Sequence, residues 1–230
     1  MREVFSGSLF FGVLISLLTY ELGVYLKKRF DFALFNPLVV SMVLIIGFLY
    51  IFQIDYETYN EGAKYLSYLL TPATVCLAVP LYEQTELLKK YTKAVIGGIT
   101  AGVLTGLLTI FVCALLFGLT HEEYVTLLPK SITTAIGMGV SEELGGMVTI
   151  TMAAIIITGI GGNMMAEMVC RIFRIEESIA KGVALGTSAH AIGTAKAMEM
   201  GQIEGAMSSL SIAVAGLITV LGASVFANFI

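Results

Sequence analysis

Long stretches without any charged residue constrain this chain more than any other feature. Asp, Glu, Lys, Arg and His are absent from residues 33–54, 94–120, 144–166 and 205–230. A helix of about 20 residues crosses a hydrocarbon core roughly 30 Å thick, so each stretch is long enough to span a membrane. Only 13% of the 230 residues are charged, about half the fraction usual in a soluble domain. The sequence therefore predicts an all-α polytopic membrane protein, with residues 1–230 forming a single transmembrane domain.

The apolar pattern predicts spanning helices near residues 5–26, 35–53, 64–82, 94–118, 146–171 and 205–229. The first is expected to be a spanning helix and not a signal peptide, because it lacks a small-residue cleavage pattern. Basic residues gather at 27–29, 89–93 and 171–181, whereas the loops 55–61 and 121–123 are acidic. Basic loops stay in the cytoplasm, which predicts an external N-terminus and a cytoplasmic residue 171.

This orientation holds if segments 127–145 and 182–200 each enter the membrane and return to the side they came from. Both are short, rich in glycine and too polar to face lipid. The prediction is about six spanning helices plus two re-entrant segments of opposite orientation; the alternative is eight spans.

Proline and glycine mark the expected interruptions of these helices, at Pro72, Pro80, Pro129, Gly137, Gly186 and Gly193. Residues 72–80 and 129–137 share the pattern Pro-x-[Ser/Thr]-x-x-x-Ala-[Val/Ile]-[Pro/Gly]. Interrupted segments at matching positions point to the central site of a transporter. The alternative is that so short a match arises by chance.

Residues 186–199 combine very small side chains with polar ones. In a continuous helix one ridge contains Gly186, Ala189, Gly193 and Ala197, along which a second backbone can approach closely. A neighbouring stripe contains Thr187, His190 and Thr194. The pattern favours the wall of a polar cavity inside a membrane protein. The alternative is a packed interior helix whose polar groups are merely satisfied.

Lys130 is the one basic residue of segment 127–145, and hydroxyls stand beside it at Ser131, Thr133 and Thr134. Pro129 fits the first turn of a half-helix, where free amide donors attract an anion. These groups predict a site for a small carboxylate. The alternative is that Lys130 reaches the outer surface and pairs with Glu122 or Glu123.

Four residues are candidates for carrying a coupled proton: His190, Glu142, Glu143 and Glu199. His190 is the only histidine expected at membrane depth, and imidazole titrates near neutral pH. The alternative for Glu142 and Glu143 is that both cap the turn before Gly145. Asn163 is expected to make an interhelical hydrogen bond.

The sequence shows no signature of an enzyme. It has no nucleophile elbow, phosphate loop or metal-spaced cluster, so no catalytic residue, metal or cofactor is expected. No basic patch suggests nucleic acid as a partner. Cys76, Cys113 and Cys170 lie in or beside apolar runs and are expected to be buried.

Residues 128–146, 182–206 and 72–82 resemble the LrgB/CidB family of membrane proteins. The bacterial members are antiholin-like, tied to murein hydrolase control and lysis, and act with a small holin-like (LrgA/CidA-type) partner. The plastidial relatives exchange glycolate and glycerate, and bacterial members are linked to pyruvate uptake. Ala135 and Gly139 depart from residues common in the family.

The resemblance implies a multi-pass protein of the bacterial inner membrane that transports small 2-oxo or 2-hydroxy monocarboxylates, by proton coupling or exchange. A homo-oligomer is expected. The substrate site is expected between segments 127–145 and 182–200, with help from 72–80; its residues are Thr74, Lys130, Ser131, Thr133, Thr134, Thr187, Ser188, His190 and Thr194. The alternative is a lysis regulator that binds no substrate and uses a lipid-facing glycine surface at Gly97, Gly98, Gly102 and Gly106.

Overall fold

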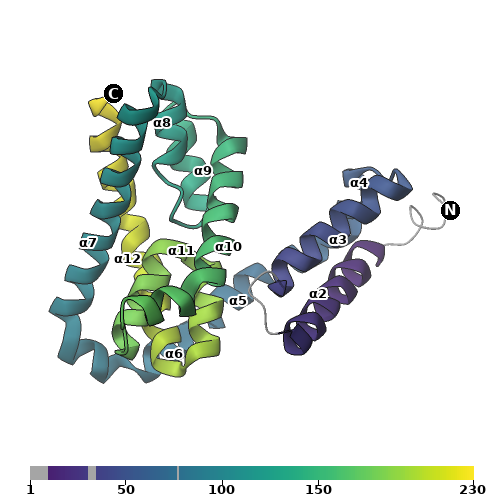
Figure 1. Ribbon diagram of the computed structural model, residues 1–230, viewed down its shortest axis with the longest axis horizontal. Helices are drawn as coiled ribbons and strands as arrows, with labels where there is room; N and C mark the ends of the chain where they lie inside the picture. The colour runs from purple at the N-terminus through teal and green to yellow at the C-terminus, as the bar shows by residue number, and fades with distance from the viewer. Residues whose placement is uncertain (1–9, 31–34, 77) are drawn as a thin grey trace. The chain divides into compact units, whose positions relative to one another are not determined.

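The computed structural model describes residues 10–30, 35–76 and 78–230, without the side chains of residues 70, 71, 74, 80 and 81 (Figure 1). These residues form helices and connecting turns, and none of the described residues lies in a strand. The chain divides into two compact units, Met1–Cys76 and Leu77–Ile230. Each unit is described by itself.

The first unit packs α3 (Pro37–Phe52) and α4 (Tyr56–Ser67) against α2 (Phe11–Phe30). Asn36 caps α3 by accepting a hydrogen bond from the Leu38 N–H at 2.9 Å, and Pro37 takes the first turn, where no amide donor is needed. Gly12 of α2 admits the α4 backbone at Tyr59 and Ala63. The small residue therefore allows α4 to pack closely across α2.

The acidic segment 55–61 was expected to be a loop, and this expectation is wrong because α4 begins at Tyr56. Asp55 takes the N-cap position and Glu57 lies in the first turn. Carboxylates are favoured there because they interact with the positive end of the helix dipole. Acidic residues that suggested a loop therefore belong to the start of a helix.

The expected helix 64–82 is interrupted, since α4 ends at Ser67 and α5 begins only at Leu70 (Leu70–Cys76). α6 (Ala78–Glu83) follows residue 77, which lies outside the described residues. Pro72 and Pro80 are each the third residue of their helix. A proline in the first turn costs no intrahelical hydrogen bond, because that N–H has no partner within the helix. The interruption at residues 68–69 therefore precedes Pro72 and does not fall on it.

The second unit continues from α6 through seven further elements: α7 (Thr85–Phe117), α8 (His121–Leu127), α9 (Thr134–Glu143), α10 (Val148–Ile172), α11 (Ser178–Met200), α12 (Gln202–Phe226) and the 3-10 helix η2 (Ala227–Phe229). Among the described residues, three helices are long and apolar enough to cross a membrane: Thr85–Phe117, Val148–Ile172 and Gln202–Phe229. The span count of six stays a prediction.

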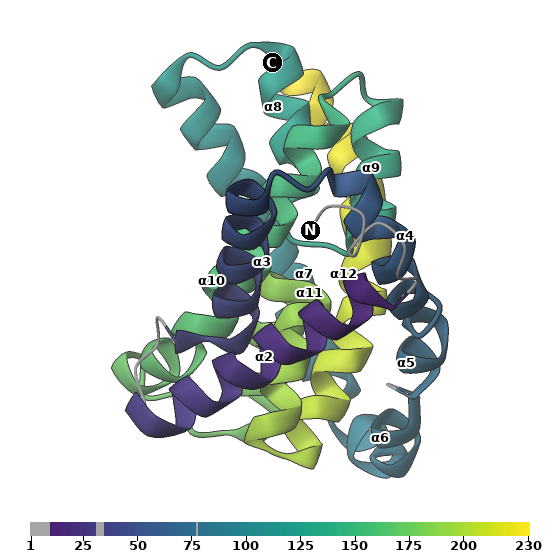
Figure 2. The same cartoon turned by 90° about the vertical axis from the view of Figure 1, so that its right-hand side faces the viewer.

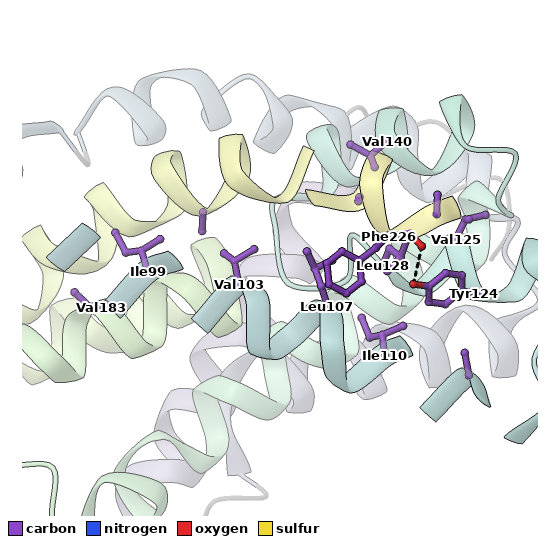
Figure 3. Packing of buried hydrophobic residues seen from close by; sticks show 14 of the residues in the cluster. Ile99, Val103, Leu107, Ile110, Tyr124, Val125, Leu128, Val140, Val183 and Phe226 are labelled. Carbon is purple, nitrogen blue, oxygen red and sulfur yellow. Dashed lines mark hydrogen bonds between the residues drawn. The ribbon is translucent and has the colours of Figure 1, made fainter. Parts of the chain in front are cut away.

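The core of the second unit lies along one face of α7. Val95, Ile99, Val103, Leu107, Ile110 and Ala114 recur every three or four residues and are buried together. Leu107 fits the space above Gly222 of α12, where a Cβ atom would lie 2.6 Å from the leucine Cδ1. The Tyr124 hydroxyl donates to the Phe226 carbonyl at 3.0 Å, which joins α8 to the end of α12 (Figure 3).

The expected burial of the cysteines is wrong for Cys76, which is exposed, and holds only in part for Cys113 and Cys170, which are half-buried. An apolar run predicts burial from water, and in a membrane protein this includes positions that face lipid.

A capping box starts α8. The Glu123 N–H donates to the Thr120 hydroxyl, and the Glu123 carboxylate accepts from the Thr120 N–H at 2.8 Å. The hydrogen bonds from the Thr120 N–H and hydroxyl lower the pKa of Glu123, because both favour the ionised carboxylate.

The stability added by this capping box should depend on pH. Since the folded state lowers the pKa of Glu123, the contribution is present above the unfolded value of about 4.3 and is lost as pH falls through the lower folded value. We expect Glu123→Gln to remove this pH-dependent component from thermal unfolding in detergent between about pH 3 and pH 7. Glu122→Gln, on the same exposed turn, is the control and should retain it; loss in both variants would contradict the assignment.

Candidate functional site

α8 and α9 form a helical hairpin. The chain leaves α8 after Leu127, turns over residues 128–133 and returns through α9. Just before α10, a Cβ atom at Gly146 would lie 3.0 Å from the nitrogen of Thr126 in α8. The Thr151 hydroxyl of α10 lies 2.6 Å from the Ser141 Oγ and 2.8 Å from the Thr126 carbonyl. These hydrogen bonds hold both ends of the hairpin against α10.

The expected half-helix does not begin at Pro129. Pro129 lies in the turn that ends α8, and α9 begins at Thr134 with Thr133 at the N-cap position. The physical reason is local: a proline cannot donate to the preceding turn and therefore ends α8. Gly137 lies within α9 and interrupts nothing; its missing side chain leaves room for Ile155.

α11 is interrupted at Ala189 and His190. Ala189 has φ −131° and ψ 15°, and His190 has φ 43° and ψ −138°. The expected interruptions, Gly186 and Gly193, lie on either side of this point and not at it. We call residues 178–188 the outgoing arm, residues 191–200 the returning arm and residues 189–190 the tip.

The two arms of α11 run in opposite directions along α12. On the outgoing arm, Cβ atoms at Gly182 and Gly186 would lie 3.0 Å from the Glu204 Cα and 2.8 Å from the Ser208 Cα. On the returning arm, the Thr194 hydroxyl lies 2.7 Å from the Ser208 Oγ, and Met198 lies against Gly205. Along the outgoing arm, the contacted residues of α12 run from Glu204 to Ser208, and along the returning arm they run back from Ser208 to Gly205. The chain therefore doubles back on itself within α11, which is a second helical hairpin.

The expectation that Gly186 admits a second backbone is confirmed by its contact with Ser208. The expected stripe of Thr187, His190 and Thr194 is wrong, because it assumed a continuous helix. The tip separates Thr187 on the outgoing arm from Thr194 on the returning arm.

The two hairpins approach α12 from opposite ends (Figure 1, Figure 2). The first lies beside the C-terminal end of α12, where His121 Nδ1 is 2.7 Å from the Ile230 carbonyl. The second lies beside the N-terminal half, between Glu204 and Ser211. A Cβ atom at Gly216 would lie 3.4 Å from the Ile136 Cδ1 of α9, so the first hairpin reaches α12 near its middle, beyond the stretch that the second hairpin contacts.

A cavity of about 1330 Å³ lies among α7, α10, the outgoing arm of α11 and the turn of the first hairpin. Four of the predicted substrate residues line it: Lys130, Ser131, Thr187 and Ser188. About half of its remaining wall is aliphatic, with contributions from Val95, Val103, Leu107, Ile110, Leu128, Ile179 and Val183, and the carboxylates of Glu176 and Glu177 line it as well. The structure thus brings the lysine of one hairpin and the hydroxyls of the other to the same cavity.

Lys130 is the cationic residue of this wall. Its Nζ donates to the Ser131 hydroxyl at 3.2 Å. Within the described part of the chain no carboxylate lies within ion-pair distance of Lys130, and the ion pairs found there belong to Lys196. The alternative pairing with Glu122 or Glu123 is therefore not seen, and Glu123 is bound to Thr120.

The hydroxyls of the cavity differ in their hydrogen bonds. Thr105, Thr109 and Ser188 donate to carbonyls of their own helices, at 2.7 Å in each case. The buried Thr187 Oγ1 has no partner among the described residues, and its methyl group lies 2.8 Å from the position of a Cβ atom at Gly102. Thr105, Thr109 and Thr158 were missed at the sequence level, because a threonine in an apolar helix carries no signal of facing a cavity.

The other predicted site residues do not line the cavity in the described part of the structure. Thr133 and Thr134 start α9, and Glu142 and Glu143 are exposed at its end. The returning arm contains Thr194 and Glu199. The side chain of Thr74, in α5 of the first unit, lies outside the described residues.

His190 is buried against α10. Its Nε2 donates to the Ile155 carbonyl at 3.0 Å, which requires the proton on Nε2. A Cβ atom at Gly159 would lie 2.6 Å from the imidazole Cε1. Asn163 Nδ2 donates to the Ile192 carbonyl at 2.9 Å, so the interhelical hydrogen bond expected for Asn163 is confirmed.

A charged cluster joins the returning arm to α10. Lys196 is buried, and its Nζ lies 2.6 Å from the Glu167 Oε1 and 3.3 Å from the Glu199 Oε2. Sequence reasoning assigned no role to Lys196. The spacing of Lys196 and Glu199, three residues apart on a helix, is a signal for this pair, whereas Glu167 is distant in sequence.

Comparisons with known proteins agree with this helical membrane architecture. The chain matches the model of the LrgB-like family over residues 16–229. It is 39% identical over 222 residues to the antiholin-like protein LrgB of Bacillus cereus (strain B4264), which covers 96% of each chain. The antiholin-like protein LrgB of Bacillus anthracis (strain A0248) matches with the same identity and coverage. No solved structure gives a significant match. The family match spans nearly the whole chain, which therefore belongs to the LrgB family.

Proposed function

We propose that this protein is a multi-pass transporter of the bacterial inner membrane for small 2-oxo and 2-hydroxy monocarboxylates. The observation that carries the proposal is Lys130, an ammonium group at the wall of a large cavity with no carboxylate partner among the described residues. A charge without an ion-pair partner at a partly aliphatic wall is costly. A substrate carboxylate supplies the missing partner through a charge-assisted hydrogen bond.

The two helical hairpins support the same proposal. We take both as re-entrant segments that enter the membrane from opposite sides, with α7, α10 and α12 as spanning helices. Transporters place their substrate at broken helices near the middle of the bilayer, between repeats of opposite orientation. Here the turn of the first hairpin and the outgoing arm of the second line one cavity.

Exchange of one carboxylate for another is the coupling mode we favour. None of the four proton-coupling candidates lines the cavity in the described part of the chain. Glu142 and Glu143 are exposed, Glu199 is paired with Lys196, and His190 donates to a backbone carbonyl. Exchange needs no net proton movement and therefore needs none of these four groups in the cavity.

The second candidate function is lysis regulation, with the protein assembling with itself or with a small holin-like partner. The name of the relatives, antiholin-like protein, favours it. This alternative relies on a lipid-facing glycine surface on α7, but Gly98, Gly102 and Gly106 line the cavity. Only Gly97 of that set does not, in the described part of the chain.

Uptake into proteoliposomes tests the proposal directly. The purified protein is reconstituted with internal unlabelled glycolate, and entry of labelled glycolate, glycerate or pyruvate is measured. We expect saturable uptake that requires the internal carboxylate and is absent from empty liposomes. Uptake no greater than in empty liposomes for all three substrates would favour the regulatory alternative.

The topology makes a separate prediction. Single cysteines at Glu57 and Glu122, in a background without the native cysteines, should react with a membrane-impermeant thiol reagent in intact cells. Cysteines at Lys28, Lys90 and Arg174 should react only after the membrane is opened, because basic loops stay in the cytoplasm. External labelling at position 174 would contradict a re-entrant first hairpin.

A further inference from the structure

We propose that Ile155 of α10 links the two hairpins, and that His190 is a positioning residue acting through it. The two polar walls of the cavity are Lys130 and Ser131 of the first hairpin and Thr187 and Ser188 of the second. The linkage goes beyond substrate binding, because it holds these two walls at a fixed spacing. Its consequence for transport rests on the proposed function, whereas its structural content does not.

The side chain of Ile155 contacts the first hairpin. Ile155 is fully buried, and a Cβ atom at Gly137 of α9 would lie 2.5 Å from its Cδ1. The same Cβ would lie 3.2 Å from the Pro129 carbonyl, in the turn next to Lys130. The Ile155 methyl therefore occupies a space that exists only because residue 137 is glycine.

The backbone of the same residue holds the second hairpin. The Ile155 carbonyl accepts the hydrogen bond from His190 Nε2 at the tip of α11. One residue of α10 therefore contacts both hairpins, one through its side chain and the other through its main chain.

The tip conformation depends on these contacts. A non-glycine residue at φ 43° and ψ −138° lies in a sparsely populated region and persists only where its surroundings hold it. The surroundings here are one face of α10: Gly159 receives the imidazole, Gly162 contacts the Ala189 Cβ, and Asn163 binds the Ile192 carbonyl. These three positions are spaced i, i+3 and i+4, so they lie together on one helix face.

The linkage has a consequence for the cavity. Lys130 and Ser131 lie in the turn that Gly137 packs against, while Thr187 and Ser188 directly precede the tip that His190 holds. Both polar walls are thus tied to Ile155 through short stretches of chain. Loosening either contact should let the walls move relative to each other.

Spin-label distances test this without relying on transport. Labels are placed at two exposed positions on the returning segments, Glu143 of α9 and Ala195 of α11, in a background without the native cysteines. We expect His190→Asn to shift the mean distance by about 2 Å or to broaden its distribution, because packed contacts otherwise move by no more than about 1 Å. Asparagine tolerates positive φ but is too short to reach the Ile155 carbonyl.

Rescue and matched glycine substitutions complete the test. His190→Gln places an amide N–H near the position of Nε2 and should keep the wild-type distance. Gly137→Ala should change the distance between the labels. Gly139→Ala makes the same substitution on the same helix, where a Cβ atom would meet nothing within 4 Å, and should leave the distance unchanged. Wild-type distances in both His190→Asn and Gly137→Ala would overturn the linkage.

Transport separates this inference from the proposed function. If wild-type protein takes up glycolate, the variants that change the distance should raise KM for glycolate and His190→Gln should not. If wild-type protein takes up no carboxylate, the proposed function fails, and the spin-label result still decides whether Ile155 links the hairpins.

Discussion

We expect Lys130→Met to raise the KM for glycolate exchange by roughly 10- to 150-fold. The lysine has no carboxylate partner among the described residues and lines the cavity together with Ser131. A hydrogen bond to a charged group contributes about 1.5–3 kcal/mol, and each 1.4 kcal/mol is about tenfold in affinity. Methionine keeps the length and apolar stem of the side chain, so the loss reports the ammonium group. Initial rates of labelled glycolate uptake at increasing external concentration measure it.

Two controls make this result specific. Lys130→Arg should keep part of the affinity, because guanidinium retains the charge but differs in shape from a compact ammonium. Lys90→Met removes an exposed lysine near the start of α7 and should leave KM unchanged. An unchanged KM in Lys130→Met would mean that the carboxylate is held by other groups.

The long helices of the second unit were the most predictable part of the fold. α7, α10 and α12 coincide with the uncharged stretches 94–120, 144–166 and 205–230 to within a few residues at most ends. The exceptions are the start of α7, where Thr85–Lys93 extends the helix through charged residues with an irregular residue at Tyr91, and the end of α10, which continues through Glu167 and Arg171 to Ile172. Charged residues are excluded only from the part of a helix that lies in the membrane. An uncharged stretch therefore does not predict how far the helix continues into water.

The interruption of α11 could be anticipated as a feature but not placed. The sequence offers Gly186 and Gly193 as the flexible positions, yet the chain reverses at Ala189 and His190. Both glycines are needed instead for close packing, Gly186 against Ser208 and Gly193 against the Leu185 carbonyl. The tip is held by residues of α10, and no local propensity encodes a contact with a helix that precedes it by about thirty residues.

The residue types of the two hairpins, a lysine beside hydroxyl side chains, were the sequence signal for the candidate site. Lys130, Ser131, Thr187 and Ser188 line the cavity, and their part in binding a substrate stays a prediction. His190 and Thr194 were grouped with Thr187 by helical periodicity, which fails when the chain reverses between them. The glycines of α7 indicated a close contact, and Gly102 does contact Thr187, but periodicity cannot tell a lipid-facing surface from a cavity wall.

The second large effect is expected from Gly186→Ala, whose midpoint of thermal unfolding in detergent should lie roughly 2–12 °C below that of Gly97→Ala. A Cβ atom at Gly186 would overlap the Ser208 carbonyl and lie 2.8 Å from its Cα. These are backbone atoms of α12 and cannot rotate away, so the outgoing arm or α12 must shift. Overpacking costs about 1–3 kcal/mol, and 1 kcal/mol corresponds to about 2–4 °C in a chain of this size.

Gly97→Ala is the matched control, because it makes the same substitution inside a helix. Nothing lies within 4 Å of a Cβ atom at Gly97, and alanine is favoured over glycine in a helix by about 1 kcal/mol. Gly97→Ala should therefore leave the unfolding midpoint unchanged or raise it by a few degrees. The same helix-propensity gain is present in Gly186→Ala, so the difference between the two variants measures the steric cost against α12. Equal midpoints would contradict the close packing of the outgoing arm against the backbone of α12.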